Sequence, residues 1–369
     1  MYNIPLLPLS YKFDSVEILK QLNRTSRQLA LLNGIVHTIP NEHLLISSLT
    51  LQEAHSSTAV ENIVTTHDDL YKHDLGEGKM YFSPATKEVY NYREAITSGY
   101  RLVMKDKLLT INIIKKIQQE LVGNSQGIVA SENKILKNDL TGETIYQPPT
   151  DFNDILKYMK NLEMFINNTE ISDLDPLIKM CIVHHQFESI HPFGDGNGRT
   201  GRIINILYLV LSGLLDVPVL YFSRYITANK GKYYNLIQAI RDSDDDSNER
   251  CWNNWVLFML KGIEHTATTT VNIVKGISSL MSKYKPILRN EFGKSYKHEM
   301  INNLFMHPYT KIKYLSQDMN IDRRTASDYL ERIVSLGLLY KEKIGRENYY
   351  INTELLNLFL SVGEENNKK

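Results

Sequence analysis

Residues 191–202 read His-Pro-Phe-Gly-Asp-Gly-Asn-Gly-Arg-Thr-Gly-Arg, and no other run of the chain calls so strongly for a chemical explanation. Its glycines, its proline and its free carboxylate are unlike the interior of an ordinary helix, because glycine and proline both weaken helices. The apolar run Ile203–Val210 follows at once and can be buried as a helix. The sequence therefore predicts a tight loop that leads into the N-terminus of a helix.

A loop followed by a helix start is suited to binding an anion. The first backbone N–H groups of a helix have no intrahelical acceptor, and the helix dipole is positive at that end. Arg199 and Arg202 are three residues apart and therefore share one face of the first turn. Asp195 adds an oxygen ligand for a divalent cation, and His191 adds a titratable base. The combination indicates a site for a polyphosphate with a divalent cation; a glycine-rich turn with solvated arginines is the simpler but less favoured interpretation.

The composition describes a chain without a strong overall charge. Among 369 residues, Lys+Arg and Asp+Glu both number 42, so no whole-chain field attracts nucleic acid or an anionic membrane. The two cysteines, Cys181 and Cys251, lie far apart, which indicates a reducing compartment without a disulfide framework. The N-terminus lacks the pattern of a signal peptide, and no apolar run is long enough to span a bilayer. We therefore expect a cytoplasmic protein of two or three domains that does not enter a membrane.

Most of the chain has the spacing of amphipathic helices. Apolar residues recur at helical intervals over 15–36, 44–63, 87–105, 110–121, 151–167, 176–190, 203–215, 232–242 and 252–281. Residues 68–84 read as a loop. Two short β-prone runs, 133–137 and 143–146, flank the turn-forming sequence 138–142 and predict one β-hairpin within the helical body. The fold class expected is mainly α.

The pattern changes again from residue 297. Three short helices, over 298–306, 312–319 and 322–336, precede strand-like runs at 338–343 and 348–351. This order is typical of a winged-helix domain. A linker is expected around Pro286 and Gly293. The predicted domains are an N-terminal helical segment over 1–85, a helical domain with the 191–202 loop over 86–285, and a winged helix over 296–355.

The second half of the helix predicted over 44–63 is unusually polar. Ser57 and Glu61 are four residues apart and share a face of that helix. On spacing alone, the favoured interpretation is an exposed helix end whose carboxylate lies in solvent.

Residues 191–202 match every fixed position of the signature of the Fic family, His-Pro-Phe-x-Asp/Glu-Gly-Asn-Gly-Arg-x-x-Arg, so the chain resembles that family. Ser57-x-x-x-Glu61-Asn62 is similar to the inhibitory motif of the family, Ser/Thr-x-x-x-Glu-Gly/Asn. This second match changes the interpretation of Glu61, because the resemblance implies an inhibitory helix that packs on the 191–202 loop.

The resemblance extends over about the whole chain. The predicted hairpin lies where the family has its target-binding flap, and the runs 223–226 and 232–234 resemble the stretch that lines its nucleotide pocket. Together with the N-terminal helices and the winged helix, these runs imply a Fic helical domain with a short β-hairpin flap. The activity implied is transfer of AMP from ATP to a Tyr, Thr or Ser hydroxyl of a protein.

This resemblance assigns roles to the loop residues. His191 would be the general base for the attacking hydroxyl, Asp195 would hold Mg²⁺, and Arg202 would bind the γ-phosphate. The residues implied in binding ATP are Gly196, Asn197, Gly198, Arg199, Thr200, Gly201, Arg202, Tyr233 and Arg241. Glu61 would pair with Arg202 in place of the γ-phosphate and keep the enzyme inactive, with Ser57 as the other member of the inhibitory motif.

Several alternatives stay open at this point. The same site could serve another nucleotidyl or phosphoryl transfer, or the Fic-like part could sense nucleotide for a DNA-binding regulator. DNA contacts through the winged helix would use Arg323, Arg324, Lys341, Lys343 and Arg346. The partners considered are ATP, a protein target that can be the chain itself, DNA, and a second copy in a homodimer.

Overall fold

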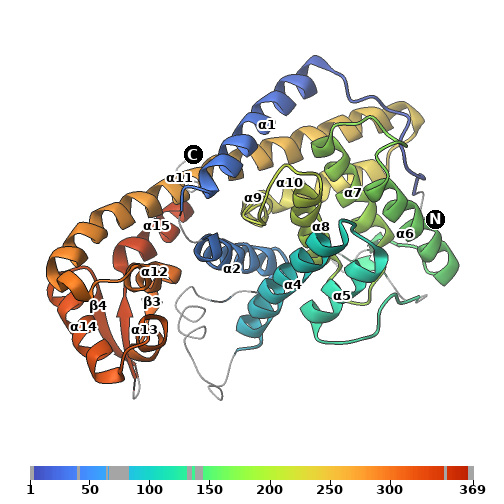
Figure 1. Cartoon of the computed structure of the whole chain (residues 1–369). Coiled ribbons are helices and arrows are strands. Elements are labelled where there is room, and N and C mark those ends of the chain that lie inside the picture. Colours follow the sequence, from blue (N-terminus) through green and yellow to red (C-terminus); the bar gives the residue numbers. More distant parts are fainter. Residues whose placement is uncertain are drawn as a thin grey trace. The chain divides into compact units, whose positions relative to one another are not determined.

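A computed structural model describes residues 4–39, 42–63, 65, 83–130, 135–137, 144–344 and 347–364 (Figure 1). The described residues are mostly helical with two small antiparallel sheets, which confirms the mainly α fold. They form two compact units: the described residues within 1–33, 50–64 and 87–267 belong to the first, and those within 34–49, 65–86 and 268–369 belong to the second. Most of the predicted loop 68–84, the turn 138–142 and Arg346 lie outside the described residues.

The first unit is built almost wholly from helices. They are α1 (Val16–Val36), the second half of α2 (Glu42–Val60), α4 (Pro84–Asp106), α5 (Ile111–Val122), α6 (Phe152–Asn167), α7 (Pro176–Ile190), α8 (Asn197–Leu211), α9 (Ser223–Ala228), α10 (Lys230–Arg241) and the first half of α11 (Asp245–Phe292). The predicted hairpin is present, with β1 (Leu136–Lys137) antiparallel to β2 (Thr144–Tyr146).

Helices α7 and α8 lie at the centre of this unit. Helix α8 packs against α7 and α5, and α7 also packs against α6 (Figure 1). Almost every residue of α7 and α8 is buried, which is the pattern of helices with no solvent face. Helix α7 begins with the Asp175 side chain accepting from Leu177 N at 2.8 Å and with Pro176 at its first position. The loop 191–196 therefore connects two helices that are fixed by the core.

The helix boundaries that differ most from those expected belong to α8 and α11, and α11 begins at Asp245 instead of at residue 252. The helix predicted to begin at residue 203 begins at Asn197, so Gly198 and Gly201 lie inside it. The helix predicted over 252–281 extends to Phe292 and contains Pro286. Tyr284 and Leu288 are buried on either side of that proline, and tertiary packing of this kind outweighs the one backbone hydrogen bond that proline removes.

The second unit contains the C-terminal elements. They are α12 (His298–Met306), β3 (Tyr309–Thr310), α13 (Ile312–Met319), α14 (Arg323–Ser335), β4 (Tyr340–Ile344), β5 (Glu347–Ile351) and α15 (Thr353–Glu364). The strands form an antiparallel sheet in the order β3-β5-β4. The three predicted helices and the predicted strand pair are present, whereas β3 and α15 were not predicted.

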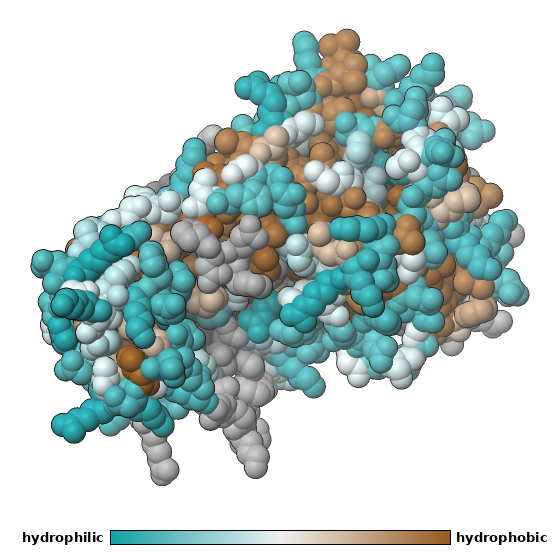
Figure 2. Space-filling model, in the orientation of Figure 1, coloured by the Kyte–Doolittle hydropathy of each residue, from teal (hydrophilic) through white to brown (hydrophobic). Residues whose placement is uncertain are grey.

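The face of the molecule shown in Figure 2 is largely hydrophilic, and its apolar residues gather mainly over the first unit. Among the helices of the described residues, none is both long and apolar enough to cross a lipid bilayer.

Candidate active site

His191 lies where α7 ends. Its backbone is left-handed, with φ 50°, and its N–H donates to Phe187 O at 2.9 Å. The loop beyond it is held by Asn197, whose Oδ1 accepts from Phe193 N at 2.9 Å and whose Nδ2 donates to Phe193 O at 2.8 Å. The Phe193 ring is buried near Phe187. The apolar ring and the asparagine therefore fix the loop between the histidine and α8.

The first turn of α8 provides backbone donors. Gly196, with φ 75°, precedes the helix, and the first intrahelical hydrogen bond runs from Thr200 N to Gly196 O at 2.9 Å. The amides of residues 197–199 therefore have no acceptor within the helix, as the sequence predicts. The amide of Gly196 donates to its neighbour Asp195 Oδ1 at 2.6 Å.

The two glycines inside α8 make room for carboxylates. A Cβ atom at Gly198 would lie 2.7 Å from Glu61 Oε1, and one at Gly201 would lie 2.9 Å from Glu188 Oε1. Both distances are shorter than a real contact, so only glycine fits while those side chains stay in place. This explains why α8 contains residues of poor helix propensity near its start.

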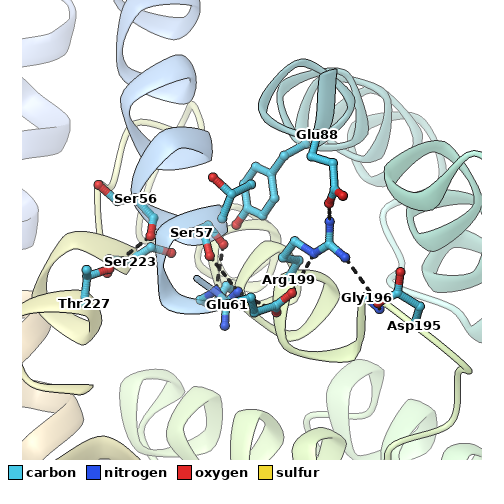
Figure 3. Close-up of polar contacts among 12 residues, drawn as sticks. Ser56, Ser57, Glu61, Glu88, Asp195, Gly196, Arg199, Ser223 and Thr227 are labelled. Carbon is cyan, nitrogen blue, oxygen red and sulfur yellow. Dashed lines mark hydrogen bonds and ion pairs between the residues drawn. The ribbon is translucent and has the colours of Figure 1, made fainter. Parts of the chain in front are cut away.

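Arg202 is the most enclosed cation of the site, with 2% of its side chain exposed. It donates from Nε to Ser57 Oγ at 2.7 Å, and from Nη2 to Ser57 O and to Glu61 Oε1, both at 2.9 Å (Figure 3). Burial alone would lower the pKa of Arg202, but the adjacent Glu61 carboxylate raises it above its usual value. Arg202 is therefore a buried cation bound by the polar end of α2.

Arg199, 3% exposed, pairs with carboxylates from three different segments. Its Nε lies 2.8 Å from Glu61 Oε2, its Nη1 pairs with Glu88 of α4, and its Nη2 lies 3.3 Å from Asp195 Oδ1 (Figure 3). Glu61, the residue that follows α2, thus bridges both arginines of the 191–202 run.

The structure therefore places Ser57, Glu61, Asp195, Arg199 and Arg202 in one cluster. The interpretation of the α2 end as solvent-exposed is wrong: Ser57 is fully buried, and the Glu61 side chain is 25% exposed. The polar residues at the end of α2 are buried because they form hydrogen bonds and ion pairs with polar residues of α8 and α9.

One residue of this cluster was not identified from sequence. Glu88 is one of two glutamates on the amphipathic helix α4, and nothing in its spacing distinguishes it from a solvated side chain.

Tyr233 and Arg241, both expected to bind ATP, make contacts within the protein. Tyr233 is buried, and its hydroxyl lies 2.8 Å from His184 Nε2. Arg241 donates from Nε to Ser189 Oγ at 3.1 Å and from Nη2 to Glu188 O at 2.9 Å.

Asp195 is suited to a hard divalent cation. Its side chain is 63% exposed, and Oδ1 accepts from Gly196 and Arg199. Among the described residues, no three His, Cys, Asp or Glu side chains gather as a complete metal site. Mg²⁺ usually keeps several waters and takes one or two carboxylates together with substrate phosphates, so a single exposed carboxylate beside a phosphate site fits it.

Chemically, the site combines two buried guanidiniums, helix-terminal amides, an exposed carboxylate of the kind that Mg²⁺ prefers, and a histidine. This set can hold a polyphosphate and accept a proton from a group that attacks it.

Three family profiles match the chain. The Fic/DOC family N-terminal profile matches residues 19–101, the Fic/DOC family profile matches residues 108–209, and the C-terminal domain profile of SoFic-like protein adenylyltransferases matches residues 280–355. The second includes the whole 191–202 run, and the first includes Ser57 and Glu61.

Curated relatives are similar over part of their length. The probable protein adenylyltransferase aq_aa38 of Aquifex aeolicus is 30% identical over 187 residues, which cover 49% of this chain and 54% of that protein. The protein adenylyltransferase Fic of Aedes aegypti is 26% identical over 143 residues, which cover 39% of this chain and 27% of that protein. The chain thus spans about half, or less, of the length of these relatives.

Two solved structures share the fold. A Fic family protein from Desulfovibrio desulfuricans superposes with a TM-score of 0.54 at 17% identity, covering 94% of this chain and 98% of the other. A Fic domain containing signaling protein from Bacteroides thetaiotaomicron gives a TM-score of 0.53 at 17% identity, covering 68% and 97%. With the complete signature, the three matched profiles and this shared fold, the chain belongs to the Fic/DOC family.

Proposed function

We propose that the protein is an adenylyltransferase that transfers AMP from ATP to a Tyr, Thr or Ser hydroxyl of a protein, its own chain included. The observation that carries this proposal is the pair of buried arginines, Arg199 and Arg202, in the first turns of α8, one short loop beyond His191. Arginine forks bind phosphate with directed hydrogen bonds, and they lie where the helix amides also favour an anion. The names of the relatives agree with this activity.

In this reaction the substrate hydroxyl oxygen attacks the α-phosphorus of ATP, and the bond to the bridging oxygen breaks. Pyrophosphate leaves, and the hydroxyl proton passes to the His191 imidazole. The negative charge on the phosphates is met by the amides of residues 197–199 and by the two arginines, which are fixed before the substrate arrives. Mg²⁺, held by Asp195, would add positive charge at the phosphate oxygens.

We also propose that Glu61 keeps the enzyme inactive. Its two carboxylate oxygens occupy Arg199 and Arg202 together, so the terminal phosphates cannot bind both arginines while Glu61 stays in place. Arg202 would remain in position without Glu61, because Ser57 supplies two further acceptors. Removal of the glutamate should therefore free the arginines without unfolding the site.

The first test compares the parent chain with Glu61→Gly and Glu61→Gln. We expect AMP transfer from α-³²P-labelled ATP to rise by roughly tenfold or more in Glu61→Gly, because both arginines become available to phosphate. Glu61→Gln keeps the size of the side chain and loses the charge, so its rate should lie between the other two. Equal rates for all three proteins would sink the inhibitory role of Glu61.

The second test addresses the chemistry. In the Glu61→Gly background, His191→Ala should abolish covalent labelling, while calorimetry should still show ATP binding, because the arginines and amides stay in place.

The labelled nucleotide distinguishes the alternative functions. Label transferred from γ-³²P-ATP instead of α-³²P-ATP would show phosphoryl transfer. Faster labelling by UTP would show uridylyl transfer. ATP binding to Glu61→Gly with no labelling in a host lysate would favour a nucleotide sensor over an enzyme.

We propose a winged helix for the C-terminal unit. In it, α12, α13 and α14 precede a β4–β5 hairpin, and β3 adds a third strand on the other edge of β5. The match to the SoFic-like C-terminal domain supports a module common to this branch of the family.

A further inference from the structure

The backbone at His191 is strained. A residue other than glycine with φ near 50° is uncommon, and a sparsely populated conformation of this kind is unfavourable. It persists only where the surrounding contacts determine it. The left-handed conformation at His191 must therefore be held by contacts with side chains near the end of α7.

Two side chains from distant segments bind the last carbonyl groups of α7. His191 N–H occupies Phe187 O, as described above. The next carbonyl, Glu188 O, accepts from Arg241 Nη2 at 2.9 Å, and the one after it, Ser189 O, accepts from the Tyr146 hydroxyl at 2.9 Å. A helix C-terminus leaves its last carbonyls without intrahelical donors, and a cation there also complements the dipole.

Tyr146 and Arg241 also contact each other. The Arg241 guanidinium carbon lies 3.9 Å from the centre of the Tyr146 ring, within cation–π distance. Arg241 Nε donates in addition to Ser189 Oγ at 3.1 Å, and Ser189 is buried. Strand β2 and helix α10 are thereby joined at the residues that directly precede His191.

The residues that follow His191 are held as well. Pro192 O accepts from Val129 N at 3.0 Å, and Phe193 forms an antiparallel bridge with Ile128. His191 therefore lies between two stretches whose backbones are each fixed by other segments.

We propose that Tyr146 and Arg241 are positioning residues that set the orientation of the His191 imidazole by binding the last carbonyl groups of α7. Arg241 then acts through His191 and does not contact ATP. Its Nε and Nη2 donate hydrogen bonds to residues of α7, and one face of its guanidinium lies on the Tyr146 ring. The kinetic part of the test rests on the proposed adenylyl transfer; the structural part does not.

The variants are Tyr146→Phe and Arg241→Lys, made in the Glu61→Gly background. Tyr146→Phe keeps the ring against Arg241 and removes one hydrogen bond, so it should fold. Tyr284→Phe is the matched control, because its buried hydroxyl also donates to a backbone carbonyl, Leu338 O at 3.0 Å, in the other unit. We expect kcat to fall roughly tenfold in both site variants, with the KM for ATP within about twofold of the background protein. Tyr284→Phe should change neither constant.

NMR of the histidine rings gives a readout that does not need catalysis. The His191 resonance is identified by its loss in His191→Gln, and it should shift in both site variants and stay unchanged in Tyr284→Phe. A tenfold rise in the KM for ATP with kcat unchanged would show instead that Arg241 contacts nucleotide. A His191 resonance that does not shift in either site variant would overturn the proposal. This conclusion would hold even if no protein in the series transferred AMP. If the Glu61→Gly protein transferred no AMP, this result would contradict the proposed function. The NMR result would then decide the positioning role by itself.

Discussion

Of the three carboxylates around Arg199, Glu88 is the one that neither the end of α2 nor the 191–202 loop supplies. It pairs with Arg199 from α4, while Glu61 pairs from α2 and Asp195 from the loop (Figure 3). Together these three anions exceed the two arginine cations, so the cluster carries a negative charge before a nucleotide arrives. A triphosphate must therefore overcome repulsion as well as replace Glu61.

This balance predicts that Glu88 weakens ATP binding. In the Glu61→Gly background, Glu88→Gln should lower the KM for ATP by roughly two- to fivefold, because one negative charge near the phosphates is removed. The effect should stay modest, since the Glu88 side chain is 36% exposed and solvent screens it. Initial rates over a range of ATP concentrations, at low and at high salt, would give the KM of both proteins. The difference in KM between them should be smaller at high salt.

Glu94→Gln is the control for that prediction. Glu94 lies on the same helix, is largely exposed and pairs with its neighbour Arg93 at 3.3 Å, so its neutralisation should leave the KM unchanged. A lower kcat in Glu88→Gln, without a lower KM, would mean that Glu88 holds Arg199 in its working position and does not repel the nucleotide.

At the scale of single elements, the second half of α2 is held against α9 by polar contacts. Glu53 Oε2 accepts from Ser223 N at 2.9 Å and its Oε1 accepts from the Ser223 hydroxyl. Ser56 O accepts from Thr227 Oγ1 at 3.0 Å (Figure 3). Because Glu61 lies two turns after Glu53, these contacts set the position of the Glu61 carboxylate.

Glu53 should make the stability of the first unit depend on pH. Burial raises its pKa from 4.5 to about 7, against the lowering effect of the Ser223 hydrogen bonds. A carboxyl group whose pKa is raised on folding stabilises the folded state fully below pH 4.5, and that contribution is lost as pH rises through 7. For one such group the loss is about 3 kcal/mol.

The test compares the parent with Glu53→Gln at pH 5 and pH 7.5. The parent should lose about 2 kcal/mol of unfolding free energy relative to the variant over this range, because the amide does not titrate and part of the full loss has already occurred at pH 5. Both tryptophans, Trp252 and Trp255, lie in the first unit, so their fluorescence during urea unfolding reports on that unit. Burial lowers the pKa of His184 and His185 to about 3, which gives the opposite slope, so only the difference between the two proteins is informative. Glu17→Gln, at an exposed site, should follow the parent.

The elements that sequence could predict are those whose signals are local. Helix α7 has an aspartate cap, a proline at its first position and a change of pattern at His191, and its predicted bounds are confirmed. The start of α8 was placed six residues late because its glycines oppose a helix locally, while the space for Glu61 and Glu188 that requires them is a tertiary feature. The signature predicted the arginine cluster, but the contacts of Glu88, Tyr146 and Arg241 depend on how distant segments meet.

At the scale of the whole molecule, the two units are built from interleaved segments. Leu44 and Leu45, in the first half of α2, are buried, and Ser48 Oγ donates to Met306 O at 3.0 Å within the second unit. The second half of α2 belongs to the first unit. Linker signals show where the chain is irregular, and they do not show to which core a helix contributes. For this reason such a division could not be predicted from sequence.

The charge distribution of the second unit predicts weak binding to DNA. Of the basic residues expected to contact a duplex, Lys341 pairs with Glu331, and the nearby Arg332 pairs with Glu291 at 2.7 Å. Arg323 and Arg324 are exposed, but the capping carboxylate of Asp322 directly precedes them. The exposed cations of this set that the described ion pairs do not occupy are Arg323, Arg324 and Lys343, so about three phosphate contacts are expected from it.

Titration of a labelled duplex by fluorescence anisotropy at several salt concentrations measures this directly. We expect the logarithm of the association constant to fall with the logarithm of salt with a slope of about −3 or shallower, which corresponds to about three phosphate contacts. Replacing Arg323 and Arg324 together by alanine should make the slope shallower by about two. A slope steeper than about −6 would contradict the prediction, because a duplex could then be bound only if the paired lysine and arginine side chains exchanged their carboxylates for phosphates. In that case the second unit would bind nucleic acid. The ion pairs of Lys341 and Arg332 would then be the contacts that these side chains make in the absence of DNA.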